Sequence, residues 1–366
     1  MAGSSFGNQF KITTWGESHG KAIGVVVDGC PAGLPLTEKD IQSFLDRRKP
    51  GSSPFVTPRK EKDEVEILSG TFDGRTTGCP ISLLVRNLTH RSSDYNHIAD
   101  IYRPGHGDYT FDHKYGFRDY RGGGRTSGRE TIGRVAAGSI ASKLLEKLGI
   151  DLYAYTKSIG PVSIDPTCFS REEIQNNPLF MPDSASAAKA EEYLTDCMKQ
   201  QDSSGGVIEC IAKNLPIGIG EPVFDKLSAN LAKAICSIGS VKAFEIGDGI
   251  EVSKARGSQN NDCFFLEKGN IAKKTNHSGG ILGGLSDGSD LILRAHIKPT
   301  SSISAPQTTV SRNGKEEEIR IQGRHDPVIV PRAVVVVESM TAITLIDMLF
   351  SNMTAKIDGI LKFYER

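Results

Sequence analysis

Hydrophobic and polar residues alternate in several short segments of the chain, and this period of two predicts β-strands. Residues 9–15 place Phe10 and Ile12 on one face and Lys11 and Thr13 on the other. Segments rich in β-branched residues and bounded by Gly, Pro or charged residues predict further strands. These segments are residues 22–36, 64–70, 79–87 and 290–297.

A spacing of four between apolar residues predicts a helix over residues 127–149, because Ile132, Ala136, Ile140 and Leu144 fall on one face. Its small residues indicate close packing against another element. Another helix is expected after Thr37, a good N-cap residue with Asp40 three positions later. Helical signals also cover residues 185–200, 224–237 and 331–350, the last in spite of a run of valines that favours a strand.

These elements predict one continuous unit of mixed helices and strands over residues 1–366, since no internal repeat or low-complexity linker divides the chain. Residues 89–127 are Gly-rich and charged and have little periodicity. A loop of this length inside a domain is functional or disordered. Its many aromatic and histidine residues favour the functional interpretation.

The composition is that of a globular enzyme, with 38% hydrophobic and 24% charged residues among 366. The formal net charge of zero provides no overall attraction to nucleic acid or to an anionic membrane. The seven cysteines include no C-x-x-C pair, which argues against a zinc site and a disulfide framework and favours the cytoplasm. No uninterrupted apolar run reaches about 18 residues, and the N-terminus lacks a signal-peptide pattern, so no membrane span or export is expected.

The stretch Gly16–Gly20 (GESHG) matches the G-x-S-x-G pattern of hydrolases that use a serine nucleophile. That nucleophile lies between a strand and a helix, whereas a second strand is predicted here, so Ser18 is a poor candidate. A Gly-bounded turn between strands would explain the glycines alone. His19 is the more useful residue, because imidazole exchanges protons near neutral pH.

A second motif spans residues 102–134, which hold six arginines among other basic residues. Any one of these residues could be a solvated surface charge. As a group, running through GGGRTSGRET into the start of a helix, they predict an anion site. Glu130 and Arg134 also have the spacing of a structural ion pair. RNA binding is the alternative, but there is one RGG and three aspartates dilute the charge.

Three later stretches contain weaker signals. Residues 276–288 (NHSGGILGGLSDG) predict either a close backbone approach to a flat ligand or a turn between strands. Residues 298–304 (KPTSSIS) combine a lysine with hydroxyl groups that could hold a phosphate, and residues 324–326 (RHD) combine an imidazole with a carboxylate. Together the motifs predict acid–base chemistry on a small molecule that carries several negative charges.

In series, the motifs GESHG, DRRKPG, RPGHGDYT, GGGRTSGRET, FEIGDG, RGSQN, NHSGGILGG, KPTSSIS and GRHDP resemble the chorismate synthase family over essentially the whole chain. The resemblance implies an α+β fold, a β-α-β sandwich with helices between two antiparallel sheets, and a homotetramer. It implies a lyase of the shikimate pathway that converts 5-enolpyruvylshikimate 3-phosphate to chorismate and phosphate by 1,4-trans elimination. Members of the family require reduced FMN although the reaction has no net redox change.

The resemblance also implies residue roles. His19 would protonate the departing phosphate, His106 the reduced flavin, and Asp326 would help the flavin accept the substrate proton. The substrate anion contacts would be Arg48, Arg129 and Arg134. The FMN site would consist of Arg125, Thr126, Ser127, Gly239, Ser240, Gly283, Lys298, Pro299, Thr300, Ser301, Ser302 and Arg324.

The chain departs from the usual pattern of the family at several positions. Gly239-Ser240 stands where many relatives have Asn-Ala, and Pro54 where many have Arg, which weakens one proposed contact to a pyridine nucleotide or substrate. Gly107 replaces a usual Ala, and Thr126 a common Ser. Some relatives reduce their own flavin with NADPH. Because this chain has no obvious insertion for that purpose, NADPH is expected to act only indirectly, through a separate flavin reductase.

Overall fold

The first of two antiparallel sheets is formed by the N-terminal part of the chain. The computed structural model describes residues 3–49, 51, 55, 61–88, 99–321 and 326–365. Neighbouring strands in this sheet follow the order β1-β2-β3-β7-β4. The strand bounds are Ser5–Phe6 (β1), Lys11–Gly16 (β2), Ala22–Asp28 (β3), Ile81–Arg86 (β7) and Val65–Ile67 (β4). The strands predicted within residues 9–15 and 22–36 are therefore confirmed. They are β2 and β3, which pair with each other.

The second sheet has the order β11-β16-β10-β8-β9, and all of its neighbouring strands are antiparallel. Its strands are Val241–Ile246 (β11), Leu291–Ile297 (β16), Gly206–Lys213 (β10), Asp151–Ile159 (β8) and Val162–Ser163 (β9). Along β16, buried residues alternate with partly exposed ones, as expected for a strand with one face on the core. Leu293 and Ala295 belong to the buried face.

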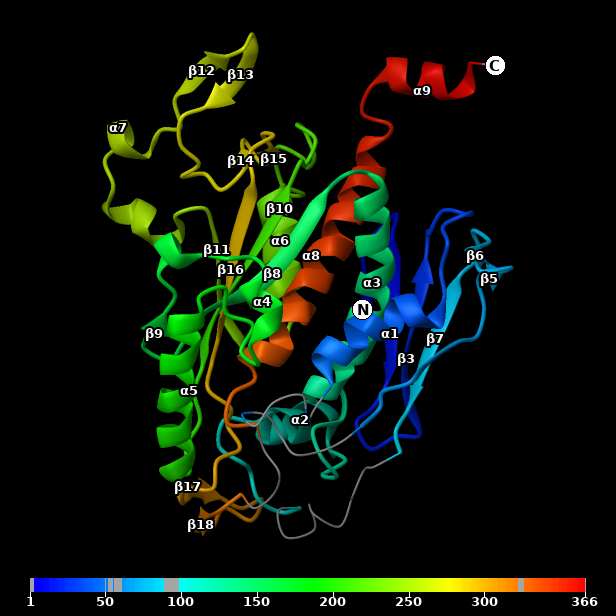
Figure 1. Ribbon diagram of the computed structural model, residues 1–366. Helices are drawn as coiled ribbons and strands as arrows, with labels where there is room; N and C mark the ends of the chain where they lie inside the picture. Colours follow the sequence, from blue (N-terminus) through cyan, green and yellow to red (C-terminus); the bar gives the residue numbers. More distant parts are fainter. Residues whose placement is uncertain are drawn as a thin grey trace.

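A layer of helices separates the two sheets (Figure 1). These helices are Glu38–Arg48 (α1), Thr131–Lys147 (α3), Leu227–Cys236 (α6) and Val330–Asn352 (α8). One hydrophobic cluster joins both sheets to these helices, from Phe10 to Met348. The β-α-β sandwich of an α+β protein is thus confirmed.

Helix α8 is the central element of this layer. It is long and apolar enough to cross a membrane by composition alone, but 83% of its most apolar window is buried inside the protein. Its valines, Val334–Val337, are buried in the hydrophobic cluster instead of pairing as a strand. A run of apolar residues longer than a typical strand is better accommodated as a buried helix.

The remaining elements lie at the ends and the outer face of the sandwich. The helices are Asp108–Tyr115 (α2), Glu173–Asn176 (α4), Ser184–Lys199 (α5), Gly257–Asn260 (α7) and Ile357–Tyr364 (α9). The small two-stranded sheets are Thr71–Phe72 with Arg75–Thr76 (β5, β6), Phe264–Glu267 with Asn270–Lys273 (β12, β13), Ile281–Leu282 with Leu285–Ser286 (β14, β15), and Gln307–Val310 with Glu316–Ile319 (β17, β18).

Two predictions about local structure need correction. The segment 89–127 was expected to be a loop, yet it contains α2, which begins after Gly107 and ends at Gly116 in the left-handed conformation. The helix predicted from residue 127 begins at Thr131, because residues 128–130 form a 3₁₀ turn. The predicted start of α1 is confirmed, since the Thr37 N–H donates to Asp40 Oδ2 over 2.8 Å.

Candidate active site

The GESHG stretch forms the turn between β2 and β3, which pair antiparallel down to Gly16 and Ile23. Gly16 is required there, because a Cβ on it would lie 2.2 Å from the carbonyl oxygen of Ala22. The element after Ser18 is a strand, so the strand–turn–helix geometry of a serine-hydrolase nucleophile is absent from this turn. The hydrolase interpretation is therefore rejected.

Two side chains from other segments hold this turn in place. Asn87 donates from Nδ2 to the carbonyl oxygens of Glu17 (2.9 Å) and Gly20 (2.8 Å). Arg125 donates to the Gly16 carbonyl over 3.1 Å and to Thr14 Oγ1 over 2.7 Å. Arg125, predicted to bind FMN, thus stabilises the end of β2 through hydrogen bonds.

His19 lies in this turn against the glycine segment that precedes α3. A Cβ added to Gly122 would come within 2.8 Å of His19 Nε2. Only a glycine permits this approach, because Gly122 also has a φ of 87°. The imidazole therefore meets the backbone of the Gly-rich, Arg-rich motif that the sequence associates with anion binding.

His106 lies on the loop before α2, and both of its ring nitrogens have partners. Nδ1 is 2.9 Å from the carbonyl oxygen of Pro104, and Nε2 is 3.0 Å from Ser302 Oγ. Because a carbonyl can only accept, Nδ1 carries the proton and Nε2 of the neutral ring accepts from Ser302. Burial, followed by the charge of Arg103, lowers the pKa of His106. The ring is therefore neutral at pH 7.

The KPTSSIS stretch follows β16 and includes Ser302, the partner of His106 Nε2. Lys298 Nζ donates to the carbonyl oxygen of Gly105 over 3.0 Å and also contacts Ser301. The Lys298 N–H donates to the Ser240 carbonyl over 2.9 Å. The predicted FMN residues of the 239–240 and 298–302 segments are thus brought together with His106.

Thr300 provides a test of whether this loop suits a phosphate-bearing cofactor. Among the described residues, its Oγ1 is buried and makes no hydrogen bond. A buried hydroxyl without a partner is costly unless a ligand completes it. Together with the ammonium of Lys298 and the hydroxyl of Ser301, it is suited to the phosphate of FMN.

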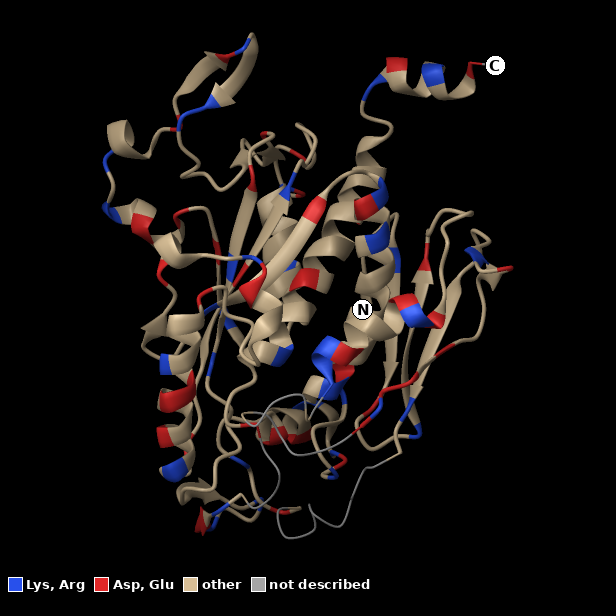
Figure 2. Ribbon diagram, viewed as in Figure 1, with Lys and Arg blue, Asp and Glu red and all other residues tan. Residues whose placement is uncertain are grey.

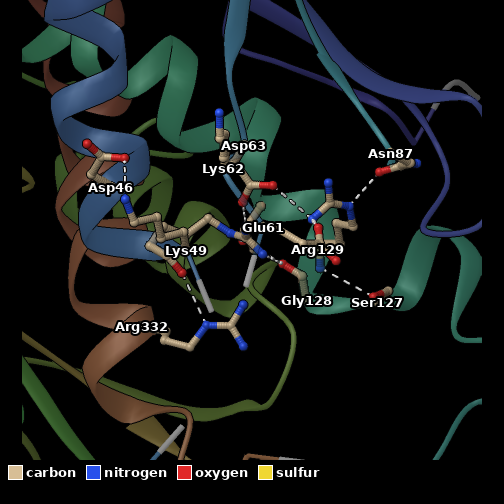
Figure 3. A network of polar contacts seen from close by, with 12 residues as sticks. Asp46, Lys49, Glu61, Lys62, Asp63, Asn87, Ser127, Gly128, Arg129 and Arg332 are labelled. Carbon is tan, nitrogen blue, oxygen red and sulfur yellow. Dashed lines mark hydrogen bonds and ion pairs between the residues drawn. The ribbon is translucent and has the colours of Figure 1, made fainter. Parts of the chain in front are cut away.

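Arg129 is the centre of a second polar cluster, next to the GESHG turn (Figure 3). Its Nε donates to Asn87 Oδ1 over 2.5 Å, and its Nη1 forms ion pairs with Glu61 and with Asp63 Oδ1 (3.0 Å). Asp63 Oδ2 in turn accepts from Arg48 Nη1 over 2.9 Å. One buried carboxylate thus joins Arg48 and Arg129, two of the three arginines that were predicted to bind substrate.

Asp326 is connected to the same cluster through Arg332 of α8. Arg332 Nη1 donates to Asp326 Oδ2 over 2.6 Å, and Arg332 Nε donates to the backbone carbonyl of Arg48 over 3.1 Å. Two further hydrogen bonds connect the segment of Asp326 to the loop that contacts His106. Its neighbour Pro327 accepts from the Ser204 N–H over 2.9 Å, and Ser203 Oγ donates to the Thr300 carbonyl over 2.7 Å.

Hydrogen bonds and ion pairs therefore connect the segments of His19, His106 and Asp326 at one end of the sandwich, the lower end in Figure 1. Two surface hollows, of about 90 Å³ beside Asp347 and about 430 Å³ beside Arg47, include none of these three residues. That the three line one cavity stays a prediction.

Other predicted site residues lie apart or have structural partners. Arg134 donates from Nε to Glu130 (3.0 Å) and from Nη1 to Ser237 Oγ (2.6 Å), so it takes the structural pairing that its spacing suggested. Thr126 Oγ1 donates to the Gly123 carbonyl over 2.6 Å. Ser127 Oγ accepts from the Arg129 N–H over 3.3 Å. Pro299 is exposed in the loop after β16.

Gly283 is separated from the other predicted FMN residues. It lies in the β14–β15 turn, which precedes β16, whereas Lys298 follows β16. A strand of seven residues spans roughly 20 Å at about 3.3 Å per residue. Within one protomer the predicted FMN set is therefore divided between the two ends of this strand. Arg324 and Pro54 lie outside the described residues.

Sequence reasoning missed Glu61, Asp63, Asn87 and Arg332, which connect the predicted residues to one another. The net charge of zero shows that carboxylates equal the basic groups in number, with 44 of each, but not where they lie. Nothing in the local EKDE pattern distinguished Glu61 and Asp63 from a solvated charge run.

Comparison with known proteins covers almost the whole chain. A family model described as chorismate synthase matches residues 10–350. A protein of Agathobacter rectalis named chorismate synthase is 64% identical over 366 residues, which is 100% of both chains, and one from Lachnoclostridium phytofermentans is 63% identical over 367 residues, again with full coverage.

A solved structure gives the same result at the level of fold. A crystal structure of chorismate synthase superimposes with a TM-score of 0.76 at 30% identity, over 95% of this chain and 94% of the other. The model match and the sequence identities agree with the sandwich and with the series of motifs along the chain. The chain therefore belongs to the chorismate synthase family, a family of enzymes that synthesise chorismate.

Proposed function

We propose that this protein converts 5-enolpyruvylshikimate 3-phosphate to chorismate and phosphate by 1,4-trans elimination, in the shikimate pathway. In this reaction the C–O bond to phosphate breaks, one C–H proton leaves the opposite face, and no net oxidation occurs. The observation that carries the proposal is the contact network from the GESHG turn through Arg129, Asp63 and Arg48 to Asp326.

The reaction needs reduced FMN, which when bound supplies electron density to the reacting carbon framework. The loop from Lys298 to Ser302 would hold its phosphate, because it combines an ammonium, two hydroxyls and the unpaired buried Oγ1 of Thr300 within the described part of the chain. Gly239 and Ser240 would support this loop from the adjacent strand end.

The three predicted catalytic residues would divide the proton transfers. His19, placed against the glycine backbone before α3, would donate a proton to the departing phosphate. His106 holds one proton at Nδ1 against Pro104 and would exchange another at Nε2, where Ser302 now contacts it. Asp326, oriented by Arg332, would assist removal of the substrate proton.

An anaerobic assay tests the function directly. Purified protein is mixed with the substrate and chemically reduced FMN, and chorismate and phosphate are measured together. We expect equal amounts of both products and none with oxidised FMN alone. Phosphate release without chorismate would contradict the proposal, because it would indicate a phosphatase.

We also propose an assembly and a source of reduced flavin. The protein would act in the cytoplasm as a homotetramer of single-domain chains, and its seven free cysteines are compatible with a reducing compartment. NADPH with oxidised FMN should give chorismate only after a separate flavin reductase is added. Chorismate formation from NADPH by the purified protein alone would instead assign flavin reduction to this chain.

A further inference from the structure

Arg48 is buried, and its guanidinium is already bound on all sides by the protein. Its Nε donates to Thr131 Oγ1 (3.0 Å), its Nη1 to Asp63 (2.9 Å) and its Nη2 to the Gly128 carbonyl (3.2 Å). Burial, and next the charge of Arg332, lowers the pKa of Arg48 to about 10. In this arrangement each of the three guanidinium nitrogens of Arg48 donates to a protein group, so Arg48 supports its neighbours.

Arg129 is a second predicted substrate arginine, and it also has protein partners. Asn87 accepts from its Nε, while Glu61 and Asp63 both pair with its Nη1 (Figure 3). Its side chain is 10% exposed. A ligand anion that approaches this guanidinium meets the carboxylates of Glu61 and Asp63, which repel it.

The charges of the cluster are balanced without any ligand. Three guanidinium groups (Arg48, Arg129, Arg332) face three carboxylates (Glu61, Asp63, Asp326). Basic and acidic residues are also interspersed among the outer elements of the protein, with no region of one sign alone in the view of Figure 2. Adding a polyanion to a neutral, buried cluster leaves its charge uncompensated, which is unfavourable.

Glu61 is the carboxylate that can leave at the lowest cost. The Asp63 side chain is 0% exposed and binds both arginines, so its departure would unpair two buried charges. Glu61 forms an ion pair with Arg129, its charge also acts on Arg48, and 8% of its side chain is exposed. The side chains of Lys62 and Glu64 point outward, at 83% and 70% exposed.

We propose that Glu61 is part of the substrate site and acts as an internal competitor: its carboxylate occupies Arg129 in the empty protein, and the phosphate of the ligand replaces it. This inference rests on the proposed function only for the identity of that ligand. A phosphate monoester carries up to two charges and three acceptor oxygens, against one charge for a carboxylate. It can therefore displace Glu61 and then receive the charge-assisted bonds of Arg129.

The test measures binding of inorganic phosphate to the full-length protein by calorimetry. Glu61→Gln removes the competing charge and should tighten phosphate binding about tenfold, because phosphate no longer has to displace a carboxylate from Arg129. Glu64→Gln is the matched control, since it makes the same change three residues later on an exposed side chain. It should leave phosphate affinity unchanged.

A third variant separates this inference from the proposed function. Arg129→Gln should abolish the gain when combined with Glu61→Gln. If Glu61→Gln binds phosphate equally or more weakly while Arg129→Gln loses binding, the competitor role is wrong and the arginine site remains. If Arg129→Gln alone leaves phosphate binding intact, both the competitor role and the substrate role of Arg129 are wrong.

Folding of the variant is followed in the same samples by thermal melting. Glu61→Gln keeps the shape of the side chain, so it should remain folded. Added phosphate should raise its melting temperature more than that of the unchanged protein, because ligand stabilisation grows with affinity. A larger shift for Glu64→Gln than for Glu61→Gln would overturn the proposal.

Discussion

His106 has the best-defined proton position of the predicted catalytic residues, because the Pro104 carbonyl fixes the proton on Nδ1. Replacing it with alanine should lower turnover by at least about a hundredfold, the usual scale for a general acid or base. The chorismate assay measures this loss. His113→Ala is the control, since that histidine is exposed on α2. Equal turnover in the two variants would remove His106 from the mechanism.

The same histidine should make stability depend on pH. Folding lowers the pKa of His106, so the unfolded chain binds the proton more readily than the folded one. The stability from the neutral ring is therefore present above the ordinary histidine pKa of about 6.5 and is lost as pH falls below it. Urea unfolding at pH 7.5 and pH 5.5 should show a smaller decline for His106→Gln than for the unchanged protein. An equal decline would mean that other groups account for it.

At the residue scale, the sequence singled out arginines and histidines as site candidates but not the groups that neutralise the arginines. Arg129 and Asp63 are 66 positions apart, and Arg48 and Thr131 are 83 apart, so no local pattern records their contact. Arg134 was the exception. Its partner Glu130 lies one helical turn away, and that pairing was visible in the spacing.

At the scale of elements, the packing of α3 on α8 depends on Gly138. A Cβ there would lie 2.2 Å from the Ser339 Cβ and 2.6 Å from its Cα, and the latter cannot rotate away. Gly138→Ala should therefore destabilise the protein by about 1–3 kcal/mol in spite of the better helix propensity of alanine. Urea unfolding measures the change.

Gly359→Ala provides the control for helix propensity. In α9 the nearest atom to a new Cβ is the Met353 carbonyl oxygen at 3.8 Å, an ordinary contact. This change should not lower the midpoint of unfolding. If Gly138→Ala also left the midpoint of unfolding unchanged, α3 and α8 would be able to move apart for the new methyl group at little cost. The close contact at Gly138 would then not limit stability.

The elements that were predicted correctly are those whose pattern agrees with their burial. β2, β3, α1 and α3 each place their apolar positions on the core. α2 was missed because its eight residues mix aromatic and charged side chains, and only Asp108 is buried. The hairpin β12–β13 was missed for a similar reason, because its apolar residues face away from the core.

At the scale of the whole molecule, the site is assembled from both halves of the sandwich. The first sheet supplies the GESHG turn and Asn87, and the second supplies the loop after β16. Helices α1, α3 and α8 cross between them and carry Arg48, Thr131 and Arg332 to the same end. The family's motifs are therefore far apart in sequence because the fold requires each sheet and the helix layer to contribute.

The opposite end of the molecule carries two apolar projections, α9 and the hairpin β12–β13 (Figure 1). None of the residues of α9 is buried, although Leu361, Phe363 and Tyr364 are large and apolar or aromatic. An isolated helix of eight residues is marginal in water, so α9 needs a surface to pack on. In the proposed homotetramer that surface is another copy of the chain.

Light scattering after gel filtration tests this assembly. The unchanged protein should have the mass of four chains, and the double change Leu361→Ser with Phe363→Ser should give a smaller species, because it removes two large exposed apolar side chains of α9. Phe72→Ser is the control, since Phe72 is equally exposed on the separate β5–β6 hairpin. A four-chain mass retained by the α9 variant would show that this helix packs elsewhere, and a monomeric unchanged protein would reject the tetramer itself.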